Sequence, residues 1–61
     1  MAEVYEIKRF LKLVKDGYII DYDGIGYFGN KTTEFEPIRN VDVQTIKKGM
    51  NKYTHVHWYN R

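Results

Sequence analysis

The chain has 61 residues, of which 43% are hydrophobic, 16% are aromatic and none is cysteine. The absence of cysteine excludes disulfide bonds and a thiolate zinc site, so a core of this size has to close on aromatic and branched aliphatic side chains. The net charge of +2 at pH 7 is too small to mark a nucleic-acid-binding protein by itself.

Residues 4–15 predict an amphipathic helix. One side of the helical wheel carries the apolar residues Val4, Ile7, Phe10, Leu11 and Val14. Gly17 follows as a C-terminal stop, and Lys12 and Lys15 stand where they complement the helix dipole. No Ser, Thr, Asp or Asn precedes Val4 as an N-cap, so a strand that runs into a Lys-Asp-Gly turn is the competing interpretation.

Residues 18–28 predict a β-hairpin. Two stretches of strand-forming residues, 18–22 and 25–28, flank Asp23-Gly24, a pair favoured in type I′ turns. A two-residue turn sets the register, which places Ile19 and Phe28 on one side of the sheet. The other side then carries Tyr18, Ile20, Tyr22, Ile25 and Tyr27.

The second half of the chain predicts a loop, a short helix and a strand. Residues 29–40 contain turn formers and Pro37, with room for a short strand around residues 33–35. Asn40 is the expected N-cap of a helix that runs to about Lys48 and stops at Gly49. Residues 53–59 alternate in the period of a strand.

Together these elements predict a single α+β domain over residues 1–61. The expected order is α-β-β-α-β, and the expected architecture is an antiparallel-type sheet of three strands, or of four if residues 29–40 contribute one, with the helices packed on one face. The N-terminal segment is acidic and lacks the apolar core of a signal peptide, and no stretch approaches the length of a membrane span. We therefore expect a cytoplasmic location and no membrane partner.

Residues 24–29 match the pattern G-x-G-x-x-G of dinucleotide-binding loops. That loop works when a helix follows it and offers its N-terminal amides to the pyrophosphate. No helix is expected to follow Gly29, so the three glycines are explained by the turn, a bulge or close backbone contact, and the strand end. No nucleotide cofactor is predicted.

His55 and His57 lie two residues apart on the same side of the last strand. Two imidazoles at this spacing can ligate zinc or copper, or serve as an acid–base pair. The sequence places no third ligand and no phosphate clamp beside them. We therefore predict no metal, no catalytic residue and no enzymatic activity.

The aromatic residues carry the functional prediction. If Ile19, Phe28, Val56 and Trp58 form the core side of the sheet, a Tyr/His-rich side remains open. Its predicted partner-binding residues are Tyr18, Tyr22, Tyr27, Tyr53, His55, His57 and Tyr59. The alternative is that this side is itself the core, because Ile20 and Ile25 lie on it as well.

The resulting hypothesis is a small non-enzymatic module that binds a protein partner, or a second copy of itself, through its sheet face. Its size and its richness in residues with A/T-rich codons suit a bacteriophage-type accessory protein, such as an adaptor or an inhibitor of a host protein. The alternative is a single-stranded nucleic-acid-binding protein in which aromatic side chains stack on bases. The phosphate contacts would then come from Lys8, Arg9, Lys12, Lys15, Lys31 and Lys52.

Overall fold

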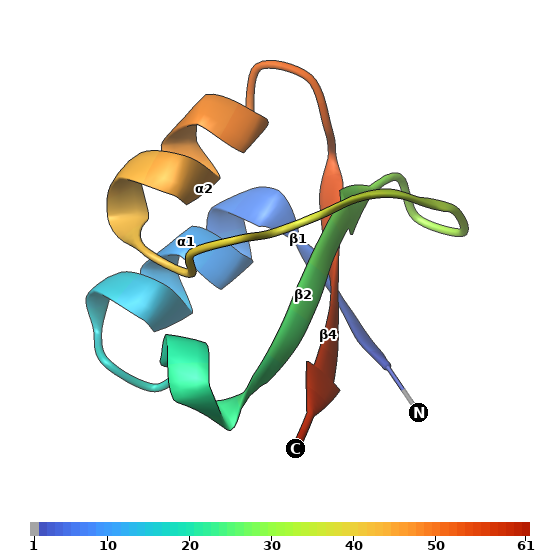
Figure 1. Cartoon of the computed structure of the whole chain (residues 1–61). Helices are drawn as coiled ribbons and strands as arrows, with labels where there is room; N and C mark the ends of the chain where they lie inside the picture. The colour runs from blue at the N-terminus through green and yellow to red at the C-terminus, as the bar shows by residue number, and fades with distance from the viewer. Residues whose placement is uncertain (1) are drawn as a thin grey trace.

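A four-stranded antiparallel sheet with two helices on one of its faces makes up the fold (Figure 1). The computed structural model describes residues 2–61, and Met1 lies outside the described part. In chain order the elements are β1 (Glu3–Glu6), α1 (Ile7–Lys15), the 3₁₀ turn η1 (Asp21–Asp23), β2 (Gly24–Gly29), β3 (Glu34–Pro37), α2 (Val43–Gly49) and β4 (His55–Asn60). The predicted α+β class, with helices packed on one face of an antiparallel sheet, is confirmed.

The strand order is β1-β4-β2-β3, which places the last strand of the chain in the middle of the sheet. Both β1 and β2 run antiparallel to β4, so they are parallel to each other and β4 separates them. The connection between them passes through α1, which makes a split β-α-β unit. β2 and β3 form the hairpin of the fold, joined by a turn over residues 30–33.

The core lies between the helices and the covered face of the sheet. Its buried apolar side chains are Ile7, Phe10, Ile19, Phe28, Ile38, Val41, Ile46, Val56 and Trp58. Trp58 and Val56 are the inward-pointing residues of β4, and the Phe10 ring of α1 lies against the Trp58 ring with centroids 5.6 Å apart. The four residues that the sequence assigns to the core side, Ile19, Phe28, Val56 and Trp58, are all buried.

The predicted start of the first helix is wrong. Residues 3–6 form an edge strand that pairs with β4, with Val4 opposite His57, and the helix begins at Ile7. Val4 fits the apolar stripe of a helix but is half-exposed on the strand. The missing N-cap was the relevant sign, because Glu6 precedes the helix without a side-chain cap. The observed element order therefore has an additional N-terminal strand.

The predicted hairpin over residues 18–28 is also wrong. Residues 18–20 form no strand, and residues 21–23 form η1, whose Asp21 carboxylate accepts a hydrogen bond from the Val41 N–H at 3.1 Å. Gly24 is not in a turn but begins β2 with an extended φ of 178°. β2 pairs instead with β4 and with β3, which contains the short strand expected near residues 33–35.

The remaining elements differ from their predicted bounds by a few residues. The N-cap of α2 is Asp42 rather than Asn40, and its carboxylate accepts a hydrogen bond from the Thr45 N–H at 2.8 Å. The last strand begins at His55 rather than at Tyr53. Within residues 2–61, no helix has the length and apolar character needed to cross a membrane.

The glycine motif of β2 has a packing explanation. A side chain at Gly24 or Gly26 would lie on the covered face of the sheet, where the Trp58 indole packs against both residues. A Cβ atom on Gly24 would lie 2.7 Å from Cζ2 of Trp58, and one on Gly26 would lie 3.3 Å from its Cε3. The strand leads through Gly29 into a turn and β3, not into a helix, so the requirement of a dinucleotide-binding loop is not met.

Candidate functional site

The face of the sheet opposite the helices is uncovered in the described chain (Figure 1). Residues paired across neighbouring antiparallel strands point to the same face. The register therefore defines an open face made of Val4 and Glu6 from β1, His55, His57 and Tyr59 from β4, Ile25 and Tyr27 from β2, and Glu34 and Pro37 from β3. Val4, Ile25 and Tyr59 are among the exposed large hydrophobic residues of the protein.

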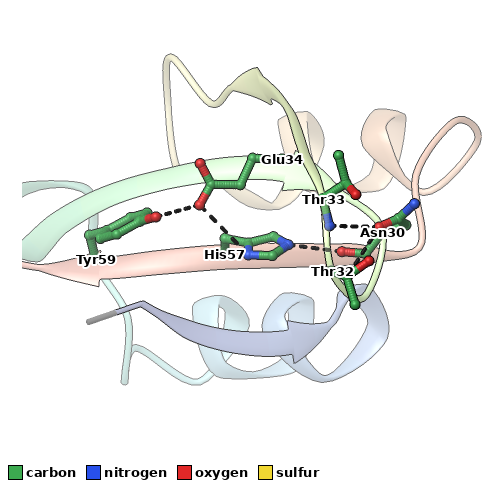
Figure 2. A network of polar contacts seen from close by, with 6 residues as sticks. All are labelled: Asn30, Thr32, Thr33, Glu34, His57 and Tyr59. Atoms are coloured by element: carbon green, nitrogen blue, oxygen red, sulfur yellow. Dashed lines mark hydrogen bonds and ion pairs between the residues drawn. The ribbon is translucent and has the colours of Figure 1, made fainter.

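A polar network fixes the middle of the open face (Figure 2). Nε2 of His57 lies 2.8 Å from the main-chain oxygen of Asn30. Because a carbonyl oxygen only accepts, Nε2 is protonated and its N–H donates the hydrogen bond. Nδ1 of His57 lies 3.7 Å from the Glu34 carboxylate, which also accepts a hydrogen bond from the Tyr59 hydroxyl. The network therefore ties β4 to β3 across the intervening strand β2.

The turn that closes over this network is itself ordered by Asn30. The Asn30 side-chain oxygen accepts hydrogen bonds from the main-chain N–H groups of Thr32 and Thr33, at 3.0 and 2.7 Å. This pattern is typical of an Asx turn. It holds the Asn30 carbonyl in place beside Nε2 of His57, so the turn and the open face form one unit (Figure 2).

The aromatic part of the open face is also fixed. The rings of Tyr27 and Tyr59 meet edge to face, with centroids 5.8 Å apart and an interplanar angle of 86°. The hydrogen bond to Glu34, followed by partial burial, raises the pKa of the Tyr59 hydroxyl above its usual value of 10.0. Tyr59 is therefore a neutral, oriented side chain at physiological pH.

Of the seven predicted partner-binding residues, the structure brings four together on the open face: Tyr27, His55, His57 and Tyr59. Tyr18 and Tyr22 are 76% and 82% exposed, but they belong to the connection between α1 and β2 and not to the sheet. Their assignment to the sheet face depended on the hairpin that does not form.

Tyr53 also lies elsewhere. It precedes β4 and stacks on the core residue Phe28, with ring centroids 5.3 Å apart and an angle of 3°. Its hydroxyl donates to Glu36 at 3.1 Å. Partial burial, together with this carboxylate, raises the pKa of Tyr53. Tyr53 is therefore packed beside the covered face of the sheet.

His57 lies on the predicted face, but it has a structural role. The residue is only 6% exposed, and it lies on the central strand β4 between Val4 of β1 and Tyr27 of β2. His55 is partly exposed and remains accessible. Val4, Glu6 and Glu34 also belong to this face, although the sequence pattern predicts a helix over residues 4–15 and mainly a loop over residues 29–40.

The basic residues of the alternative hypothesis are spread over different parts of the molecule. Lys8, Lys12 and Lys15 belong to α1, which covers the other face of the sheet, and Lys52 follows α2 (Figure 1). Only Arg9 and Lys31 approach the open face, where they line a surface depression with His55. Few cations therefore accompany the open-face aromatic side chains.

The two histidines are not placed as a metal centre. His57 already donates to a main-chain carbonyl, and no group of three or more potential ligands in residues 2–61 is arranged to hold a metal ion. The Glu34 carboxylate, 3.7 Å from Nδ1 of His57, is engaged by Tyr59.

No protein-family model, curated protein or solved structure matches this chain. Its function therefore has to be inferred from the open face itself.

Proposed function

We propose that the protein is a small non-enzymatic binding module whose open face docks against a partner protein. The observation that carries this proposal is the uncovered sheet face, on which the half-exposed apolar residues Val4, Ile25 and Tyr59 surround a closed polar network. Exposed apolar area grouped on one face favours association, because burial of such area is the main favourable contribution to binding.

The fixed geometry of the face adds to this argument. Tyr59 donates a hydrogen bond to Glu34 and packs against the ring of Tyr27, so its side-chain conformation is fixed in the free protein. Side chains that are ordered in the free protein lose little conformational entropy on binding. Tyrosine also combines a large contact area with a hydroxyl that tolerates water at the rim of an interface.

A protein partner is favoured over a nucleic acid by the charges of the face. Glu6 and Glu34 lie on it, and a carboxylate repels the phosphates that a stacked single strand would bring close. Most of the lysines lie on the helices behind the sheet. A stoichiometric adaptor or inhibitor of another protein fits a rigid face on a domain of this size.

The matched pair Ile25→Asp and Ile20→Asp tests the proposal. The two isoleucines are 49% and 47% exposed, but Ile25 lies on the open face and Ile20 lies outside the sheet. We expect the wild type and Ile20→Asp to capture the same protein in a nuclease-treated extract of the source cells. Ile25→Asp should reduce that capture at least tenfold while its thermal unfolding stays cooperative.

Three results would overturn the proposal. Equal capture by both variants would show that the open face does not contact the partner. Loss of every partner on nuclease treatment would favour the nucleic-acid alternative. In sedimentation, a wild-type dimer that only Ile25→Asp dissociates would identify the occupant as a second copy of the chain.

A further inference from the structure

One end of the open face is hollowed into a surface depression of about 610 Å³. Its lining residues are Val4, Tyr5, Glu6, Arg9, Lys31 and His55. They come from β1, from the first turns of α1, from the β2–β3 turn and from the start of β4. Three nitrogen-bearing side chains therefore reach one hollow from three separate parts of the chain.

The cations of this depression have no partner within the described chain. Among residues 2–61, neither Arg9 nor Lys31 takes part in an ion pair or in a side-chain hydrogen bond. Nδ1 of His55 lies 2.9 Å from Oγ1 of Thr54, which leaves Nε2 as the ring nitrogen that can face a ligand. The donors of the depression are thus free for a group from outside.

The charge balance of the depression decides which anion it suits. Arg9 and Lys31 contribute two positive charges and Glu6 one negative charge, so these three side chains leave a net charge of about +1. A single carboxylate matches this balance, whereas a doubly charged phosphate would meet the Glu6 carboxylate as well. Val4 adds an apolar contact for the methylene groups of an acidic side chain.

We infer that this depression receives an aspartate or glutamate side chain of the partner protein, held by Arg9, Lys31 and His55. The inference rests on the proposed function, because it names the chemistry that the partner must present beside the apolar part of the open face. Arg9 can bind the carboxylate with two parallel N–H donors, and Lys31 adds a flexible point charge from the turn.

A peptide titration followed by ¹⁵N amide NMR tests the site without the partner. The probes are an acetylated and amidated Asp-Glu-Asp tripeptide, the neutral Asn-Gln-Asn counterpart and inorganic phosphate. We expect the acidic tripeptide to shift the amides of Glu6, Lys31 and His55 in the millimolar range, and the neutral one to leave them in place. The double variant Arg9→Ala/Lys31→Ala should lower the shifts at Glu6 and His55 at least fivefold.

Lys12→Ala is the matched control, because Lys12 is exposed on α1 and does not line the depression. Equal shifts with the neutral tripeptide, or shifts that survive the double variant, would overturn the inference. If only phosphate gives saturating shifts, the depression binds a phosphate group and not a carboxylate, and the inference is wrong. If Ile25→Asp abolishes partner capture and Arg9→Ala/Lys31→Ala leaves it unchanged, the depression is not used while the proposed function stands.

Discussion

Nε2 of His57 lies 2.8 Å from the main-chain oxygen of Asn30, so a side chain of the central strand β4 fastens the β2–β3 turn onto the open face. A carbonyl oxygen only accepts hydrogen bonds, and this contact therefore requires the proton on Nε2. His57 is also buried, with 6% of its surface exposed. Fold and candidate binding surface thus depend on one contact between residues that are 27 positions apart.

We expect His57→Ala to lower the free energy of unfolding by about 2–3 kcal/mol, because it opens a cavity and removes the donor of a part-buried hydrogen bond. His57→Gln, whose amide can still donate, should recover part of that loss. His55→Ala, on the same face but without such a contact across the sheet, should cost much less. Urea unfolding measures all three, and equal costs for the two alanine variants would contradict the structural role of His57.

Gly49, in the last turn of α2, is expected to resist substitution. A Cβ atom there would lie 2.4 Å from Cε1 of Phe28, whose ring is buried and stacks on Tyr53 on another side. Overpacking of this kind costs about 1–3 kcal/mol, which exceeds the roughly 1 kcal/mol that alanine gains over glycine within a helix. We therefore expect Gly49→Ala to lower the unfolding midpoint in urea.

Two further variants separate the steric effect from helix propensity. Lys48→Ala, in the same turn but exposed, should change stability by no more than about 0.5 kcal/mol. In a Phe28→Leu background, where the aromatic ring is gone, Gly49→Ala should lose its cost. A penalty that persists there would show that packing against Phe28 is not the cause.

The local patterns of this chain predict its elements better than their pairing. The alternation of residues 55–59 places Val56 and Trp58 correctly in the core, because period-2 patterning depends only on the strand itself. Asp23-Gly24 is an equally clear signal for a hairpin turn. No hairpin forms there, because β2 pairs with β4, a strand some 30 residues later in the chain. A Cβ atom on Gly24 would collide with the main-chain oxygen of Tyr59 and with the Trp58 indole, both on β4, a cause that no residue near Gly24 in the sequence reveals.

The sequence likewise predicts those residues of the candidate site that depend on a single strand, but not those that depend on how the strands pair. Tyr27, His55 and Tyr59 were assigned to the open face because each follows the alternation of a strand that does form. Glu34 could not be found from sequence, since its contact with Tyr59 depends on β3 lying next to β2. From the sequence, Arg9 and Lys31 are only two of several basic residues. Their proximity to His55 depends on the relative positions of α1, the β2–β3 turn and β4.

Both edge strands of the sheet are acidic, and this arrangement should oppose pairing between copies. β1 reads Glu-Val-Tyr-Glu and β3 reads Glu-Phe-Glu-Pro, whereas the two central strands contain no Asp, Glu, Lys or Arg. Antiparallel pairing of two β1 strands about their centre would set Glu3 opposite Glu6 twice. Like charges directly opposite each other destabilise such a pair.

We therefore expect Glu3→Gln/Glu6→Gln to raise the association constant of self-pairing roughly tenfold, as measured by sedimentation velocity over a range of concentrations. Asp16→Asn/Asp23→Asn changes the net charge by the same amount away from the edges and serves as the control. If both double variants associate equally, net charge rather than edge repulsion keeps the copies apart.

Three tyrosines donate a hydrogen bond to a glutamate, Tyr5 to Glu3, Tyr53 to Glu36 and Tyr59 to Glu34, and the structure raises the pKa of each phenol above 10.0. The folded state then holds these protons more tightly than the unfolded state. Their contribution to stability is complete below pH 10 and is lost as the pH rises through the raised pKa values.

We expect the urea midpoint to fall as the pH rises above 10, and Glu34→Gln to reduce that fall, because Tyr59 then loses the carboxylate that raises its pKa most. Absorbance at 295 nm, which follows phenolate formation, should show Tyr59 titrating at lower pH in that variant. Asp42→Asn removes a carboxylate that caps α2 and bonds no tyrosine, so its alkaline profile should follow the wild type. If Glu34→Gln leaves the profile unchanged, the hydrogen bond to Glu34 does not stabilise the neutral phenol and the open face is less fixed than its geometry implies.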